Sequence, residues 1–452
     1  MLIDFSIEAV MDHILFTSCV FLLIGSLYIT FKTRFVQFRF FPDLFKMFLR
    51  SMSLKEQAGK SSVLPHKALL AAMSTTLGIG TIVGPIIAIH LGGPGALLGF
   101  ILTSVLGSAA TFTEVCLCVK FRSKSKFGCL IGGPMEYLKM IISPRMAKWY
   151  AICCCILMTA WSGAQANQLA AILDSPLLGD YRISPVISGL ILAGLVFFSL
   201  FGGIKRISSL SAKIVPLMFI LFLGSSFWIL LLNVELLPSI FSSIFSSAFS
   251  PYAMASGTIV GGVVSSLRWG IFKGTQATEA GIGTQTIPHS MTDSEDAIYQ
   301  GTLSMISTYT AGLVAFLSGC VVLVTGTWEN PELPIGISMI AASFKMYFSS
   351  VGLAIVAFCT FLFGFGTSVG NSYNGSQCFI YLMGPKQIHY YFIFSACVIF
   401  LGAIAEVKTF WSIIDLFLAG MAIPHMFALM RYVYEYKLSA NSREGRKSSS
   451  VI

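Results

Sequence analysis

Apolar runs of about 20 residues follow one another along nearly the whole chain, separated by short polar segments. A helix of this length crosses the hydrocarbon core of a membrane. A further apolar segment, residues 335–346, is too short to span. The pattern predicts about eleven spans. They lie at residues 14–31, 68–90, 96–119, 149–173, 185–201, 215–232, 252–288, 302–324, 351–382, 390–404 and 412–430.

The composition agrees with this interpretation. Hydrophobic residues make up 55% of the 452 residues, and charged residues only 11%. A soluble domain carries about 25% charged residues, so a soluble globular fold is excluded. The net charge of +9 does not indicate nucleic-acid binding, because the basic residues are concentrated in particular loops beside apolar runs. We expect an all-α polytopic membrane protein, with the lipid bilayer as its surroundings.

Lysine and arginine are concentrated at residues 32–67, 120–148 and 205–213 and in the tail after residue 430. When the eleven spans alternate in direction, all of these segments fall on one side. Loops rich in Lys and Arg stay in the cytoplasm. The charge pattern therefore predicts a bacterial-type inner (plasma) membrane protein with an outside N-terminus and a cytoplasmic C-terminus.

Two of the predicted spans are interrupted by the same tetrapeptide. It appears as Gly78-Ile79-Gly80-Thr81 and again as Gly281-Ile282-Gly283-Thr284. Glycine costs about 1 kcal/mol relative to alanine in a helix interior, so paired glycines mark places where the helix breaks. Glycines that only allow close helix packing are the alternative. Matching interrupted spans in two halves of a transporter point to a binding site at the bilayer midplane.

The repeated tetrapeptide also predicts the symmetry of the chain. It pairs the second span with the seventh, so each half holds five spans. An odd number of spans inverts the second unit, which gives a 5+5 inverted repeat with one extra N-terminal helix. The expected parts are the N-terminal span with its basic loop (1–67), the two repeats (68–235 and 252–432) and a disordered cytoplasmic tail (433–452).

A broken helix offers chemistry suited to a zwitterion. Its free N–H groups attract a carboxylate, and its free C=O groups attract a cation. A small amino acid with a co-transported cation fits both ends. The 11 Cys and 6 His show no metal-ligand spacing, and no nucleophile–base constellation is visible. We therefore expect no enzyme activity and no cofactor.

Several motifs occur in the order typical of one transporter family. They are Gly78–Gly84, Gly92–Ala96, Glu114, Lys120–Arg122, Gly132–Tyr137, Gly202–Ile207, Val215-Pro216, Glu279–Gly283, Gln300-Gly301, Trp411, Asp415 and Met421–Pro424. In these motifs the chain resembles the alanine or glycine:cation symporter family, the sodium:alanine symporters. The resemblance implies a leucine-transporter-type fold and sodium-driven uptake of alanine or glycine, with sodium as co-substrate.

The resemblance and the two breaks together suggest a set of site residues. The candidate substrate-binding residues are Gly78, Gly80, Thr81, Gln165, Thr278, Gly281 and Thr284. By resemblance to this fold class, a hydroxyl pair in the ninth span meets carbonyls before the first break. That implies a sodium site at the Leu77 carbonyl, Thr367 and Ser368. Both hydroxyls could instead bond their own helix, and Gln165 could serve only helix packing.

The chain departs from the family pattern at the breaks. Thr81 and Thr278 stand where the family has Asn, and so does His425 near the end of the chain. These changes leave the substrate and the ion open. One alternative is proton coupling, with Glu279 or His425 as carrier, although Glu279 could also be a structural partner of Lys273. Another is a transport-inactive channel or scaffold. The oligomeric state stays open.

Overall fold

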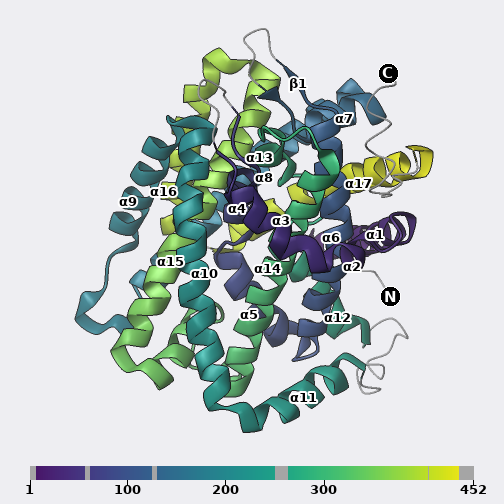
Figure 1. Ribbon diagram of the computed structural model, residues 1–452. Helices are drawn as coiled ribbons and strands as arrows, with labels where there is room; N and C mark the ends of the chain where they lie inside the picture. The colour runs from purple at the N-terminus through teal and green to yellow at the C-terminus, as the bar shows by residue number, and fades with distance from the viewer. Residues whose placement is uncertain (1–6, 56–61, 125–129, 250–262, 406, 437–452) are drawn as a thin grey trace.

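The computed structural model describes residues 7–55, 62–124, 130–249, 263–405 and 407–436. Helices make up almost all of this part of the chain (Figure 1). Its only sheet is a short hairpin of strands β1 (Ser123–Lys124) and β2 (Leu130–Ile131). The expected all-α class is confirmed.

The helices follow the apolar runs of the sequence. In the first half the α-helices are α1 (Ile7–Lys32), α2 (Val36–Arg39), α3 (Leu44–Met52), α4 (Pro65–Thr76), α5 (Ile79–Gly92), α6 (Ala96–Lys120), α7 (Pro134–Ile141), α8 (Pro144–Leu173), α9 (Pro185–Leu200), α10 (Gly203–Leu232) and α11 (Leu237–Phe249). In the second half they are α12 (Val263–Thr278), α13 (Thr286–Ser290), α14 (Ala297–Thr325), α15 (Ile337–Met383), α16 (Ile388–Ile404) and α17 (Val407–Tyr436).

Six of the described helices are long and apolar enough to cross a membrane, and the bent pair α4–α5 makes a possible seventh. The protein is a multi-pass membrane protein. The helices α1, α9 and α12 also coincide with predicted spans. Compared with the six long helices, their apolar parts are shorter or their sequences are less apolar. The count of eleven and the inverted repeat stay predictions.

One local expectation needs correction. Residues 237–249, expected as a loop, form helix α11, which lies across the ends of the long helices at the bottom of Figure 1. The short apolar segment at 335–346 does form a helical piece of its own, because the non-helical Ser349 (φ 51°, ψ −136°) divides α15 into two parts. Helix α17 begins at Val407, and its apolar, membrane-spanning part begins at Ile414, close to the predicted residue 412. The start of the seventh span (252–262) and most of the tail (437–452) lie outside the described residues.

The first tetrapeptide does interrupt a helix. α4 ends at Thr76 and α5 begins at Ile79, with a bend of 41° between them. Leu77 has φ −85° and ψ 69°, and Gly78 is extended at φ −101° and ψ 179°. The chain therefore leaves the helix for two residues and then re-enters it.

The second tetrapeptide lies in a longer interruption. α12 ends at Thr278, and the next helical residue is Thr286. Gly281 and Gly283 have φ of 76° and 97°, values that glycine adopts without steric cost. Glu279 also has a positive φ, 52°, which is uncommon for a residue with a side chain. The predicted break at residues 281–284 is confirmed.

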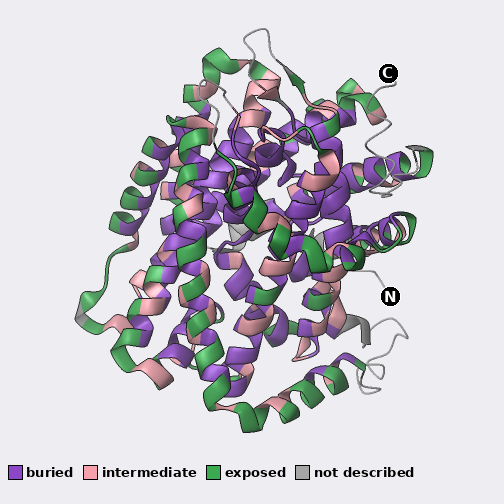
Figure 2. Ribbon diagram, in the orientation of Figure 1, coloured by how far each residue is buried: buried purple, intermediate pink, exposed green. Residues whose placement is uncertain are grey.

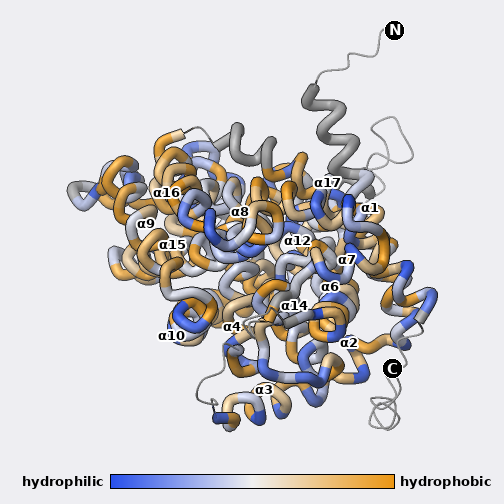
Figure 3. The backbone as a smooth tube through the Cα atoms, turned by 90° about the horizontal axis from the view of Figure 1, so that it is seen from above, coloured by the Kyte–Doolittle hydropathy of each residue, from blue (hydrophilic) through white to orange (hydrophobic). Residues whose placement is uncertain are grey.

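The broken helices lie in the interior of the bundle. Helices α6, α8, α14 and α15 pack around them, and their ribbons are mostly buried in Figure 2. Helices α9, α10 and α11 carry exposed residues along their outer sides, among them Phe198, Ile220 and Phe245. In Figure 3, orange hydrophobic stretches alternate with blue hydrophilic ones on the peripheral helices, and the visible end of α10 is hydrophilic. Exposed apolar side chains suit a surface that faces lipid.

Helices α6 and α12 approach each other closely through glycine. A Cβ atom on Gly99 would lie 2.6 Å from the backbone of Gly270 and Ile271. A Cβ on Gly270 would collide with the Ala96 carbonyl oxygen. Small residues allow this kind of helix contact in membranes, where no hydrophobic force holds helices together. The contact fixes α12 in place just ahead of the second break.

We predict that Gly270→Ala destabilises the protein, because an added methyl group must push α12 away from α6. Overpacking of this kind costs about 1–3 kcal/mol. The melting temperature of the purified protein in detergent should fall by several degrees in a fluorescence thermal-shift measurement.

Gly194→Ala in α9 is the matched control, because a Cβ at Gly194 meets no atom within 4 Å. Alanine favours a helix over glycine, so this variant should melt at the same temperature or higher. Equal melting of both variants would contradict the proposed close contact.

Candidate functional site

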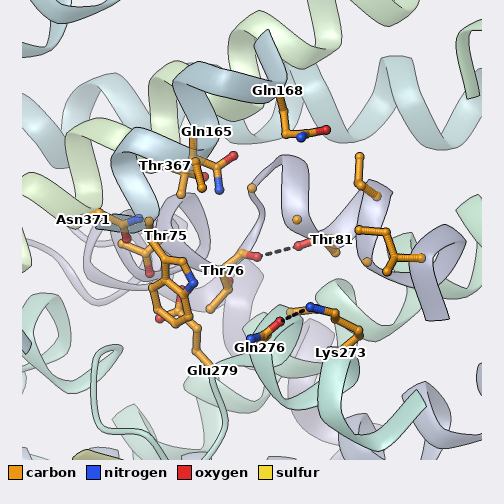
Figure 4. A pocket seen from close by; sticks show the side chains of 18 residues that line it. Thr75, Thr76, Thr81, Gln165, Gln168, Lys273, Gln276, Glu279, Thr367 and Asn371 are labelled. Atoms are coloured by element: carbon orange, nitrogen blue, oxygen red, sulfur yellow. Dashed lines mark hydrogen bonds between the residues drawn. The ribbon is translucent and has the colours of Figure 1, made fainter. Parts of the chain in front are cut away.

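A cavity lies where the two broken helices meet α8 and α15 (Figure 4). Its walls include residues of both breaks, among them Gly78, Gly80 and Glu279. The cavity volume is about 40 Å³. A hole of this size holds a few water molecules or a small solute, because one water needs roughly 10–15 Å³ on the same measure.

At the first break, side chains satisfy backbone groups that the helix leaves free. The Ile79 N–H, at the start of α5, donates to Gln165 Oε1 over 2.8 Å. The Thr81 hydroxyl donates to the Thr76 carbonyl oxygen over 2.7 Å, across the break. Gly80 lines the cavity, and a Cβ there would meet no atom within 4 Å. The N-terminal end of α5 therefore opens onto free space.

Gly78 brings the side chains of the site together. A Cβ on Gly78 would lie 2.9 Å from Gln165 Nε2 and 3.0 Å from Thr367 Oγ1. Both contacts are tighter than ordinary van der Waals packing. A larger residue at position 78 would push Gln165 of α8 and Thr367 of α15 away from the break, which they approach from two different helices.

The carbonyl end of α4 faces hydroxyl groups of α15. Thr367 Oγ1 lies 2.8 Å from the Ser74 carbonyl oxygen and 3.2 Å from that of Leu77, and it donates to them. The neighbouring Ser368 is fully buried, and its hydroxyl has no hydrogen-bond partner among the described residues. The predicted sodium-site residues are thus adjacent in sequence or in direct contact. An oxygen-rich, incompletely bonded corner of this kind suits a hard cation.

Asn371 is a site residue that the sequence analysis missed. It lines the cavity one helical turn after Thr367 and is 1% exposed. Neither its amide nitrogen nor its amide oxygen has a hydrogen-bond partner among the described residues. A buried amide without partners costs free energy unless a ligand or water completes it. The i, i+4 spacing from the predicted hydroxyl could have identified it.

The opposite wall carries a chain of polar side chains from α12. Lys273 Nζ donates to Gln276 Oε1 over 3.2 Å, and Gln276 Nε2 donates to Asp415 Oδ1 of α17 over 2.7 Å. Lys273 also lies over the ring of Phe272, 4.7 Å from its centre. These contacts hold a positive charge at the edge of the cavity, as Figure 4 shows for Lys273 and Gln276.

Three of the predicted substrate residues are not among those that line the cavity. Thr278 donates to the Gly274 carbonyl of its own helix over 2.9 Å. The Gly281 carbonyl oxygen lies 2.8 Å from His425 Nδ1. The Thr284 hydroxyl donates to Glu279 Oε2. The structure brings together Gly78, Gly80, Thr81 and Gln165 at the cavity, and it places these three behind it.

Comparison with known proteins gives one family. The family model described as the sodium:alanine symporter family matches residues 2–440. An uncharacterized transporter of Haemophilus influenzae is 32% identical over 89% of this chain and 88% of its own. The sodium/alanine symporter AgcS of Methanococcus maripaludis is 29% identical over 90% of each chain.

A solved structure shares the fold. It is the substrate-bound outward-open state of a Na⁺-coupled sialic acid symporter, with a TM-score of 0.54 and 16% identity. The match covers 87% of this chain and 82% of that one. At this identity the likeness concerns the arrangement of helices alone.

Proposed function

The chain belongs to the sodium:alanine symporter family, and from this premise we propose that it couples sodium entry to the uptake of alanine or glycine by alternating access. It is a cation-coupled amino-acid transporter and not an enzyme, with sodium as co-substrate. The proposal concerns which amino acid it carries, which residues hold the two solutes and how the chain is oriented.

The Ser368 hydroxyl is the observation that carries the sodium part. It is buried without a partner beside Thr367, which already bonds the two carbonyl oxygens at the end of α4. A sodium ion there would be coordinated by the Ser368 oxygen, the Thr367 oxygen and the Leu77 carbonyl oxygen. The negative end of the α4 dipole adds to the attraction.

The amino acid is expected at the start of α5. The first N–H groups of a helix attract a carboxylate. Gly80 leaves open space there, and the unpartnered amide of Asn371 faces the same cavity. The small volume favours alanine or glycine over a larger amino acid. Thr278, Gly281 and Thr284 would support the second break from behind and would not touch the substrate.

Contacts among the loops support the proposed orientation. The segments before α4 and after α13 pair through Val63, whose N–H donates to the Met291 carbonyl oxygen over 3.0 Å. Arg122, just after α6, donates to the carbonyl oxygens of Thr292 and Ser294 over 2.6 and 2.7 Å. Predicted cytoplasmic loops thus meet at one end, opposite α11 in Figure 1. If the spans alternate in direction across the membrane, the two five-span units have opposite orientations, as an inverted repeat requires.

Uptake of labelled alanine and glycine into proteoliposomes tests the proposal. A sodium gradient should drive saturable uptake, and replacing sodium with choline should abolish it. Uptake that ignores sodium but collapses with a protonophore would replace the proposal with proton coupling. Binding without uptake would favour a transport-inactive protein.

We predict that Ser368→Ala weakens sodium binding while the protein stays folded, because the lost hydroxyl has no partner in the described structure. A bond to a charged group contributes about 1.5–3 kcal/mol, so the apparent sodium affinity should fall about tenfold or more. Alanine uptake measured against sodium concentration gives this value.

Ser376→Ala is the control on the same helix, because the Ser376 hydroxyl bonds only the Tyr373 carbonyl oxygen of α15. It should leave the sodium dependence unchanged. Equal sodium affinity in the Ser368 variant and the wild type would place the ion elsewhere.

We also predict that Gly80→Ala changes the substrate preference. The added methyl group meets no protein atom and takes up space in the cavity. One methyl group in a tight pocket is worth about 1–3 kcal/mol, so the ratio of kcat/KM for alanine to that for glycine should fall about tenfold.

Gly224→Ala in α10 serves as its control, since a Cβ there also meets nothing within 4 Å, and Gly224 is not among the residues that line the cavity. The ratio of kcat/KM for alanine to that for glycine should be clearly lower in Gly80→Ala than in Gly224→Ala. If Gly80→Ala keeps the wild-type ratio, the substrate side chain does not lie against the start of α5.

A further inference from the structure

Behind the second break, away from the cavity, titratable side chains of several helices converge. Glu114 comes from α6, Tyr137 from α7, Tyr150 from α8 and His425 from α17. All four are completely buried. The transport function proposed above uses none of them, so their presence in the core requires another explanation.

The hydrogen bonds of His425 can all be made by a neutral ring in this conformation. Nδ1 lies 2.8 Å from the Gly281 carbonyl oxygen, which can only accept, so Nδ1 carries a proton. Nε2 is hydrogen-bonded to the hydroxyl of Tyr137. A neutral ring satisfies both contacts, with Tyr137 donating to Nε2. His425 therefore needs no positive charge here, and it ties α17 to the second break.

Glu114 is the unsatisfied group of the cluster. The N–H groups of Gly281 and Gly283 face its carboxyl group. Neither oxygen, however, has a hydrogen-bond partner within normal distance among the described residues. His425 Nδ1 is 4.0 Å from Oε2, and its proton is already directed to the Gly281 carbonyl. For an ionised carboxylate in this position, these two N–H groups and the distant His425 would compensate the buried charge only in part.

The surroundings make the ionised form still less favourable. The groups that face Glu114 electrostatically are Glu279 in the break, Tyr137, Tyr150, His425 and Cys118 of its own helix. Among them only His425 can become positive, and Glu279 is a second acid. Glu279 accepts a hydrogen bond from Thr284, which supports its ionised form. A negative charge on Glu279 disfavours a second one on Glu114.

We propose that Glu114 is a proton-binding site that controls the second break. With the proton bound, Glu114 is neutral, and His425 holds the Gly281 carbonyl. When the proton leaves to water, the carboxylate attracts the Nδ1–H of His425, which lies 4.0 Å away. His425 then releases Gly281, and the hydrogen bond between α17 and the second break is lost. This inference concerns a proton distinct from the transported sodium ion and does not depend on which amino acid is carried.

Infrared difference spectroscopy tests the site directly. The purified full chain in detergent should show the C=O stretch of a buried protonated carboxyl group near neutral pH. E114Q should lack this band, and E279Q should keep it. Loss of the band in E279Q with retention in E114Q, or no such band in the wild type, would overturn the proposal. If E114Q does not fold, the wild type and E279Q still decide the question.

The pH profile of uptake gives a second, functional readout. Once the medium is alkaline enough to ionise Glu114, the protonated fraction falls about tenfold per pH unit, and wild-type uptake should fall with it. Glutamine imitates the protonated acid, so E114Q should keep its uptake in alkaline medium. A parallel decline of both proteins would contradict the inference. A failure of sodium coupling would leave the infrared result unaffected, so the two proposals fail separately.

Discussion

The whole site depends on one constraint: backbone N–H and C=O groups inside a membrane need hydrogen-bond partners. A continuous helix meets this need internally, and a broken one cannot. At the first break Gln165 and Thr81 supply part of what is missing, and Thr367 covers two carbonyl oxygens. The groups that stay unsatisfied, above all Ser368 and Asn371, are the ones with capacity left for a solute. The groups that can bind a solute therefore lie where the helix is interrupted.

The two breaks share a tetrapeptide but differ in environment. The first interrupts its helix for two residues and faces the cavity, with open space at Gly80. The second is longer, and its backbone oxygens are held from several helices: Tyr150 bonds Ile282, His425 bonds Gly281, and Asn374 bonds Thr284. We attribute solute binding mainly to the first break and conformational control to the second.

Much of the architecture could be predicted from sequence because membrane helices have a simple signature. The apolar runs predicted the positions of the long helices, and the repeated glycines predicted the positions of both interruptions. Side-chain direction could not be predicted in the same way. Thr278 lies beside the break in sequence, yet it bonds its own helix at Gly274. Asn371 lies far along the chain from either break and joins the site only because α15 packs against α4. Helix α11 was missed because its serines and phenylalanines do not make a long apolar run.

In the proposed mechanism, the interrupted helix α4–α5 binds sodium and the amino acid with its own backbone. Amide hydrogen exchange, measured by mass spectrometry on the peptide that covers residues 74–84, tests this most directly. Exchange there should be slower when sodium and alanine are both present than in choline chloride with alanine. The peptide around Gly194 should exchange equally in both. Identical exchange at residues 74–84 under the two conditions would contradict the claim.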